Sequence, residues 1–233
     1  MERNLLVIGG SSGVGLEIVK QLSAQGDRVY AASRTEGELA VLSGVTWQAY
    51  DVTDREAKLT LPEQLDGLVY CPGTIQLKPF GRLSDEDFQQ ELEVNFFGAV
   101  RVIRQAHAGM KAAPLASIVL FSTVAVGTGL PYHAGIASAK GALEGLARTL
   151  AAEFAPKIRV NSLALSLTDT PLAGTLLSTE EKRRASAERH PLKRIGDAAE
   201  VAKAAAFLLG PESGFMTGQV MKIDGGISTL KLL

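Results

Sequence analysis

The chain has 233 residues, and its 24 Lys and Arg residues nearly balance its 25 Asp and Glu residues, which leaves a formal net charge of -1. The hydrophobic fraction of 46% allows a sizeable core, and the lack of a basic excess argues against nucleic acid as a partner. A single cysteine excludes an internal disulfide framework, and no signal peptide or membrane-spanning run is apparent, so we expect a soluble cytoplasmic protein without a membrane partner.

Short apolar runs alternate with longer stretches of helical periodicity along the chain. The first run, Leu5–Ile8, predicts a buried strand, and the helix expected over residues 15–25 ends at Gly26, because glycine tolerates the left-handed conformation there. Further strands are expected at residues 28–32, 46–50, 65–70, 117–121, 158–162 and 219–223. Longer helices are expected at about residues 84–112, 132–154 and 197–209.

This alternation predicts one α/β domain over residues 1–233. The expected fold is a Rossmann-like, doubly wound parallel sheet of about seven strands with helices on both faces. The only long irregular stretch covers about residues 166–195. Such a stretch in a compact domain is usually a lid or a binding loop, so we expect it to cover a substrate.

A glycine-rich segment follows the first strand and opens the first helix. Its Gly-x-x-x-Gly-x-Gly spacing lets the backbone approach a pyrophosphate, and the helix N-terminus offers free N–H groups. A glycine-rich turn without a ligand is the alternative, but a dinucleotide fold places its phosphate loop at this first βα turn. The residues expected to bind a cofactor here are Gly9, Ser11, Ser12, Gly13, Val14 and Gly15.

The end of the second strand carries Ser33 and Arg34 and no acidic residue. An acidic side chain there would bind the ribose hydroxyls of NAD, whereas a guanidinium suits a 2′-phosphate. We therefore expect NADP(H) to be preferred over NAD(H), with a merely solvated Arg34 as the alternative. After the third strand, Asp51 and Val52 are placed to read the adenine edge, and a simple turn capped by Asp51 is an equal alternative.

Taken in order, these motifs and several later ones resemble the classical short-chain dehydrogenase/reductase family over nearly the whole chain. The later motifs are Val94-Asn95, Lys140, Arg159-Val160-Asn161, Thr170-Pro171, Pro191-Leu192 with Arg194 and Gly196, and Thr217-Gly218-Gln219 with Asp224-Gly225-Gly226. The resemblance implies hydride transfer between NADP(H) and a small carbonyl or alcohol substrate, with no metal. It adds Gly73, Asn95, Lys140, Thr168 and Thr170 to the expected cofactor-binding residues.

The catalytic pattern of the family is incomplete in this sequence. The family uses Asn, Ser, Tyr and Lys, with the Tyr four residues before the Lys and the Ser thirteen residues before the Tyr. Counting back from Lys140 places Ile136 at the tyrosine position and Thr123 at the serine position. By resemblance, Lys140 would hold the nicotinamide ribose, Thr123 the substrate oxygen and Asn95 a water in a proton relay. The proton donor itself is missing.

Two turns near the expected cofactor also depart from the family pattern. Tyr70-Cys71-Pro72-Gly73 stands where the family has Asn-Asn-Ala-Gly, and Leu165-Ser166 where it has Pro-Gly. We expect Cys71 to be a buried small residue and not a nucleophile. His107 and His190 have no motif around them and are expected at the surface.

Tyr132 and His133 are the nearby candidates for the missing proton donor. If Pro131 were the first helical residue, Tyr132, Ile136 and Lys140 would share a face, although Tyr132 would lie about 6 Å farther from the lysine than the usual tyrosine. His133 lies seven residues before Lys140, a spacing that resembles relatives reducing enoyl thioesters, and imidazole donates protons near neutral pH. The alternatives are packing at a helix start for Tyr132 and a solvated loop for His133.

A competing function follows from Ile136. The chain would then be a catalytically weak or inactive nucleotide-binding protein of the same fold, acting as a cofactor sensor or a partner subunit. In either case we expect a homodimer or homotetramer, because the helices at about 84–112 and 132–154 carry more apolar residues than one sheet face can cover. These residues include Phe96, Phe97, Ala99, Ala142, Leu143, Leu146 and Leu150.

Overall fold

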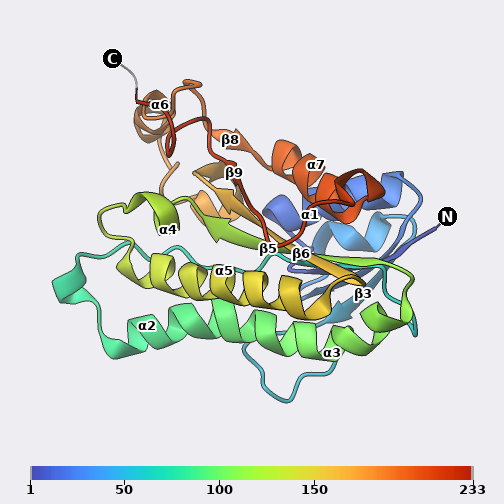
Figure 1. Ribbon diagram of the computed structural model, residues 1–233. Coiled ribbons are helices and arrows are strands. Elements are labelled where there is room, and N and C mark those ends of the chain that lie inside the picture. The colour runs from blue at the N-terminus through green and yellow to red at the C-terminus, as the bar shows by residue number, and fades with distance from the viewer. Residues whose placement is uncertain (1, 232–233) are drawn as a thin grey trace.

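Seven parallel strands form one continuous sheet in the computed structural model, which describes residues 2–231 (Figure 1). The order across the sheet is β3-β2-β1-β4-β5-β6-β9. The strands are β1 Asn4–Ile8, β2 Arg28–Ser33, β3 Val45–Ala49, β4 Gly67–Tyr70, β5 Ala116–Thr123, β6 Ile158–Leu165 and β9 Val220–Ile223. The predicted parallel, doubly wound sheet is therefore confirmed.

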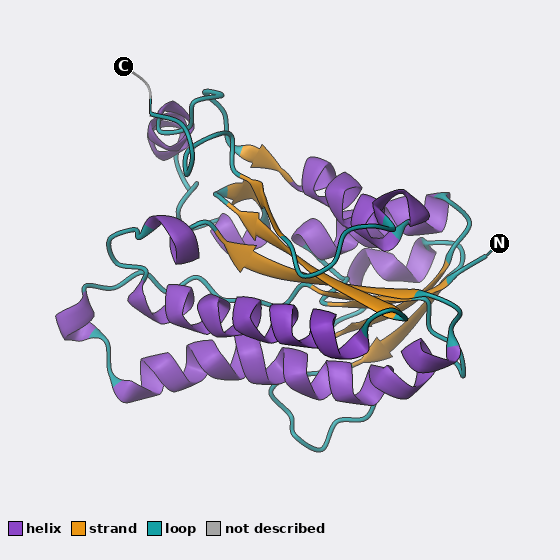
Figure 2. Cartoon of the chain, in the orientation of Figure 1, coloured by secondary structure: helices purple, strands orange, loops and turns teal. Residues whose placement is uncertain are grey.

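Helices cover both faces of this sheet (Figure 2). The helices of the chain are α1 Gly13–Ala24, α2 Asp85–Leu92, α3 Gly98–Ala112, α4 Ala125–Thr128, α5 Ala134–Phe154, α6 Glu180–Glu188 and α7 Ala198–Leu209. The core on one face joins the sheet to α3 and α5, and the core on the other joins it to α1 and α7. No helix among residues 2–231 has the length and apolar character needed to cross a membrane.

The first strand explains why the buried strands read as continuous apolar runs. Leu6 and Ile8 pack on the α3 and α5 side, whereas Leu5 and Val7 pack on the α1 and α7 side. All four are at most 1% exposed. Because successive side chains of a strand point to opposite faces, a strand covered on both sides must be apolar at every position.

The strand order reverses at β1, whose neighbours are β2 on one side and β4 on the other. In open α/β sheets, ligands bind at such a switch point, beyond the carboxyl ends of the strands. The loops after β1, β4, β5 and β6 all leave the sheet at this edge, because the strands are parallel. The topology thus selects one edge of the sheet for the site.

The helix expected over residues 84–112 is built in three parts. Ser84 caps α2 through a reciprocal capping box with Asp87, and a π-helical segment, Glu93–Phe97, joins α2 to α3. The wider π turn contains Asn95, which is fully buried. π-helical turns inside α-helices occur frequently at functional sites.

Two boundaries differ from the sequence-based expectation. The helix expected over about residues 132–154, with Pro131 as a possible first residue, begins at Ala134, because Tyr132 has a φ of 70° and so cannot continue a helix. The stretch expected to be irregular, residues 166–195, contains β7 Thr168–Asp169 and α6. The side chain of Thr179 accepts a hydrogen bond from the Lys182 N–H and starts α6, a capping signal that the sequence carries.

Candidate active site

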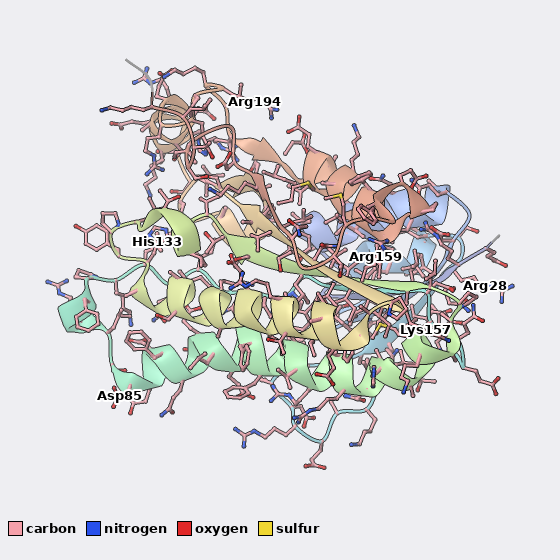
Figure 3. All side chains as sticks on the ribbon, in the orientation of Figure 1. Arg28, Asp85, His133, Lys157, Arg159 and Arg194 are labelled. Atoms are coloured by element: carbon pink, nitrogen blue, oxygen red, sulfur yellow. The ribbon has the colours of Figure 1, made fainter. Side chains whose placement is uncertain are left out.

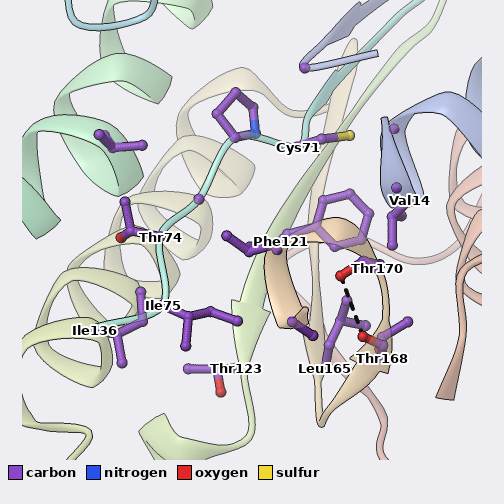
Figure 4. A pocket seen from close by; sticks show the side chains of 18 of the residues that line it. Val14, Cys71, Thr74, Ile75, Phe121, Thr123, Ile136, Leu165, Thr168 and Thr170 are labelled. Atoms are coloured by element: carbon purple, nitrogen blue, oxygen red, sulfur yellow. Dashed lines mark hydrogen bonds between the residues drawn. The ribbon is translucent and has the colours of Figure 1, made fainter. Parts of the chain in front are cut away.

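A large cleft opens at the carboxyl edge of the sheet, with a volume of about 1190 Å³. It extends from the glycine-rich loop after β1 to the segment between β6 and α7. Figure 4 shows the part in which Thr123, Ile136 and Ile75 lie opposite Leu165 and Thr168. Most of the residues predicted from the sequence to form the site line this one cleft.

The glycine-rich loop is shaped to bring backbone close to a ligand. Gly9 has a φ of 76°, and a Cβ on Gly15 would lie 2.2 Å from the Gly9 carbonyl oxygen, so neither position accepts a side chain without rearrangement. Ser12 precedes α1 without capping it through its own side chain. The N-terminus of α1 therefore faces the cleft with its N–H groups, a geometry that suits a pyrophosphate.

Arg34 and Ser33, at the end of β2, differ in exposure and in hydrogen bonding. Arg34 is exposed, lines the cleft and makes no ion pair among the described residues. Ser33 is only 5% exposed, and its hydroxyl donates to the Thr35 carbonyl at 2.8 Å while accepting from Trp47 Nε1 at 3.0 Å. The serine hydroxyl is thus occupied, and Arg34 is the group that fits a 2′-phosphate.

Asp51 caps a turn, as the alternative interpretation predicts, and it also lines the cleft. Its Oδ1 accepts from the Thr53 N–H at 2.9 Å and from the Thr53 hydroxyl at 2.7 Å, and these bonds lower its pKa. Val52 is buried beside Gly98 and also lines the cleft. The adenine-reading role of both residues stays a prediction.

The segment after β6 packs against the glycine-rich loop. The Thr170 hydroxyl donates to the Thr168 carbonyl at 3.4 Å, as Figure 4 shows. A Cβ on Gly13 would lie 3.4 Å from Thr170 Cβ. Thr168 and Thr170 therefore close the cleft from the side opposite the sheet edge that carries Thr123.

Lys140 is buried in α5 with only 6% of its surface exposed, and it lines the cleft. Burial lowers the pKa of Lys140 to about 8, and the attraction of Glu91 offsets part of that effect. Ile136 lies one turn earlier, is 5% exposed and faces the same cleft. Thr123 ends β5, where its hydroxyl accepts from the Ala125 N–H at 3.2 Å.

Asn95 lies behind Gly73, fully buried. A Cβ on Gly73 would lie 3.2 Å from Asn95 Oδ1 and 3.6 Å from Lys140 Nζ, so Gly73 leaves these two groups close together. Asn95 Nδ2 donates to Thr74 Oγ1 at 2.7 Å and to Glu91 Oε2 at 2.9 Å. Thr74 and Glu91 were not predicted as site residues, and only their nearness in sequence to Gly73 and Asn95 hints at them.

The structure separates the two candidate proton donors. Tyr132 is 59% exposed in the turn before α5 and is not among the residues that line the cleft. His133 does line it, and its Nδ1 lies 2.7 Å from the Pro131 carbonyl oxygen. Figure 3 shows His133 between α4 and α5. The expectation that Tyr132 shares a helical face with Lys140 is wrong.

His190 is 2% exposed and lines the cleft, so the expectation of a surface position is wrong. Its Nε2 lies 2.8 Å from the Ser166 hydroxyl, and its Nδ1 lies 2.8 Å from the Ser186 carbonyl oxygen. Gly225, which has a φ of 57°, packs its backbone against the imidazole ring. With both ring nitrogens hydrogen-bonded, the histidine can be buried without the usual cost of an unpaired polar group.

His107 and Cys71, for which no catalytic role was predicted, lie in different surroundings. His107 stacks on Phe154 with ring centroids 4.6 Å apart, outside the cleft. Cys71 lines the cleft, and burial raises the pKa of its thiol to about 12. At neutral pH it is therefore a thiol and a poor nucleophile, but it is half-buried and not fully buried as the sequence predicted.

A parallel doubly wound sheet, a glycine-rich loop at its switch point and a buried lysine that lines the same cleft define a Rossmann-like α/β protein with a dinucleotide-type cleft. A family model described as enoyl-(acyl carrier protein) reductase matches residues 9–228. A tropinone reductase homologue of Arabidopsis thaliana is 37% identical over 246 residues, covering 97% of this chain and 92% of the relative. L-xylulose reductase of Bos taurus is 33% identical over 233 residues, covering 96% of each.

Solved structures give the same answer. A short-chain dehydrogenase/reductase family protein superposes with a TM-score of 0.86 at 30% identity, covering 97% of this chain and 98% of the other. ElxO with NADP bound superposes with a TM-score of 0.88 at 26% identity, covering 97% and 99%. The chain belongs to the short-chain dehydrogenase/reductase family of oxidoreductases. That Ile136 occupies the tyrosine position of the family stays a prediction.

Proposed function

We propose that this protein is an NADP(H)-dependent oxidoreductase that interconverts a small carbonyl and its alcohol with an unusual proton donor. The observation that carries the proposal is the arrangement of Arg34, the glycine-rich loop and Lys140 along one cleft. The loop and the α1 N-terminus fit a pyrophosphate, and Arg34 fits a 2′-phosphate in place of an acidic residue. Two structural neighbours, ElxO with NADP bound and a variant of actinorhodin polyketide ketoreductase with NADPH, support this choice.

Each residue has a distinct role in the proposed reaction. The chemistry that NADP(H) supplies when bound is hydride transfer to or from the substrate carbon. Lys140 holds the nicotinamide ribose, Thr123 hydrogen-bonds the substrate oxygen, and Thr170 binds the carboxamide. Asn95 orients a water that connects Lys140 to the relay. Gly73 and Thr168 complete the wall, and the segment over residues 166–195 acts as the lid.

His133 is the proton donor that we favour. Its ring lines the cleft, and the Nδ1 contact with the Pro131 carbonyl leaves Nε2 as the free nitrogen. An imidazolium Nε2–H can give its proton to a substrate oxygen. Tyr132, exposed in the preceding turn, reaches the substrate only if that turn rearranges.

A nucleotide-binding protein without dehydrogenase activity is the second candidate, and Ile136 is the observation that favours it. Ile136 has no ionisable group, and its side chain fills the place one turn before Lys140. The two functions differ in turnover and not in cofactor binding. The test is a panel of aldehydes, ketones and sugars with NADPH oxidation followed by absorbance. Turnover supports the oxidoreductase, and tight NADPH binding without turnover on any substrate supports the binding protein.

We further propose that the protein is a homodimer or homotetramer that pairs through the outer face of α3 and α5. Of the apolar residues expected there, Ala99 and Leu143 belong to the core at 0% exposure, whereas Phe97 is 46% exposed and packs edge-on against Phe96. The proposal therefore rests on Phe97 and its neighbours. Light scattering at micromolar concentration tests it, and a monomeric mass contradicts it.

A further inference from the structure

A buried carboxylic acid that plays no part in the proposed reaction lies beside the active-site lysine. Glu91, on α2, is 2% exposed. Its Oε2 accepts hydrogen bonds from the Thr74 hydroxyl and from Asn95 Nδ2. Gly135 of α5 makes room for it, because a Cβ there would lie 3.3 Å from Glu91 Cγ. Acidic residues are rarely buried without a partner, so this placement needs an explanation.

Polar atoms without a hydrogen bond gather around Glu91. Within residues 2–231, Glu91 Oε1 and Asn95 Oδ1 are buried and have no hydrogen-bond partner. Asn95 Oδ1 and Lys140 Nζ both lie within 4 Å of the position a Cβ on Gly73 would take. The Asn95 amide therefore contacts the Glu91 carboxyl group through Nδ2, and its Oδ1 lies beside Gly73, as does Lys140 Nζ. One acceptor of each side chain is left to face the lysine or a bridging water.

The other ionisable groups near Glu91 and Lys140 do not compensate the charges of these two residues. Asp87, one turn before Glu91, is paired with Lys78 at 2.8 Å, so its charge is already compensated. Cys71 faces Lys140 as a neutral thiol. Burial raises the pKa of Glu91 and lowers that of Lys140, and each group opposes the shift of the other. Among the described residues, neither Glu91 nor Lys140 forms an ion pair within 4 Å with any other side chain.

We propose that Glu91 is a positioning residue of the active site, the buried counter-charge that keeps the Lys140 ammonium ionised and holds Asn95 and Thr74 in place. The reason for the arrangement is electrostatic, since a lysine stripped of water loses its proton unless a carboxylate stands nearby. This inference rests on the proposed function, in which Lys140 must be cationic to hold the nicotinamide ribose. It adds to that function a residue on another helix that controls when the lysine is charged.

The experiment measures NADPH affinity by fluorescence titration from about pH 6 to about pH 10 at fixed ionic strength. Wild type loses affinity as Lys140 deprotonates near its pKa of about 8. In Glu91→Gln the midpoint moves to lower pH, and each pKa unit of movement weakens binding about tenfold at pH values above both midpoints. Gln keeps an acceptor for Thr74 and Asn95, so a purely structural role of Glu91 would not move the midpoint.

Three further variants test whether the shift in midpoint comes from the charge of Glu91. Glu93→Gln removes a carboxylate that is paired with Arg101 at 2.7 Å, and it keeps the wild-type midpoint. Lys140→Met abolishes the midpoint. Glu91→Leu, an apolar replacement that needs no hydrogen bonds, repeats the test if Glu91→Gln fails to fold. An unchanged or raised midpoint in the Glu91 variants overturns the inference, as does a wild type whose affinity does not change with pH.

A second readout needs no cofactor. Lys140 has a lowered pKa in the folded state, so folded stability rises with pH between about 8 and the unfolded value of 10.5. In Glu91→Gln this rise begins at lower pH than in wild type. If NADPH does not bind at all, the proposed function fails, whereas the stability series still decides whether Glu91 sets the charge of Lys140. The same onset in both proteins overturns the inference.

Discussion

Ile136 and Lys140 lie one helical turn apart on α5, and both side chains face the cleft. We predict that Ile136 occupies the tyrosine position of the family, so that an aliphatic side chain replaces a phenol that would reach both the lysine and a substrate oxygen. Figure 4 shows that Ile75 is the labelled neighbour of Ile136 on the cleft side. Under the proposed function, we expect this pair of residues to set the rate at which the protein reduces carbonyls.

Restoring the phenol tests this relationship directly. In Ile136→Tyr, the nearby ammonium of Lys140 lowers the pKa of the new phenol, and reductase activity on a simple ketone rises by about 10²-fold, within the range of general acid catalysis. Ile136→Phe is the matched control, since it fills the same space without a hydroxyl. A rise in both variants, or in neither while NADPH stays bound, contradicts this explanation.

His133 and Tyr132 can be separated by two conservative changes. His133→Asn keeps a donor for the Pro131 carbonyl but has no proton to give, so we expect kcat/KM to fall by about 10²-fold with cofactor affinity unchanged. Tyr132→Phe removes only an exposed hydroxyl and leaves kcat/KM as in wild type. The reverse pattern would identify Tyr132 as the donor and would require the turn before α5 to move.

Lys140 makes folded stability depend on pH in a known direction. Its pKa is 10.5 in the unfolded chain and about 8 when folded, so burying the ammonium costs stability below pH 8. That cost disappears between pH 8 and pH 10.5 and amounts to about 3 kcal/mol. Urea unfolding across this range should show the gain in wild type. Parallel curves for wild type and Lys140→Met would mean that the lysine is not buried in its charged form.

The Ser166–His190 pair is predicted to be structural in the free protein. His190→Ala leaves the Ser166 hydroxyl and the Ser186 carbonyl without their partner, and we expect a loss of about 1–3 kcal/mol in the free energy of unfolding. His107→Ala is the control, because that ring stacks on Phe154 and makes no hydrogen bond among the described residues. Equal losses in the two variants would show that the buried hydrogen bonds of His190 do not contribute measurably to the free energy of unfolding.

Much of the fold could be predicted because it rests on local signals. The apolar run of β1 and the glycine pattern after it specify a strand, a turn and a helix N-terminus without reference to distant residues. The start of α5 could not be predicted, since Pro131 is an acceptable first helical residue and only the positive φ of Tyr132 moves the boundary to Ala134.

Only the site residues that match motifs of the family could be predicted from the sequence. Lys140 and Thr123 line the cleft, whereas Asn95 is fully buried and does not line it, and the catalytic roles of all three stay predictions. Glu91 and His190 were missed because their burial depends on partners far along the chain, Thr74 for one and Ser166 for the other. A lone acidic residue or histidine in a sequence carries no sign of such a partner, and solvent exposure is the usual expectation for acidic side chains.

Two dissociation constants, for NADPH and for NADH at one stated salt concentration, test whether the cleft binds NADP(H). We predict that NADPH binds at least about tenfold more tightly, because a charge-assisted hydrogen bond to the 2′-phosphate contributes about 1.5–3 kcal/mol. Arg34→Ala should remove most of this preference, and Arg55→Ala, a change of an exposed arginine outside the cleft, should keep it. Equal dissociation constants, or tighter binding of NADH, would contradict the account.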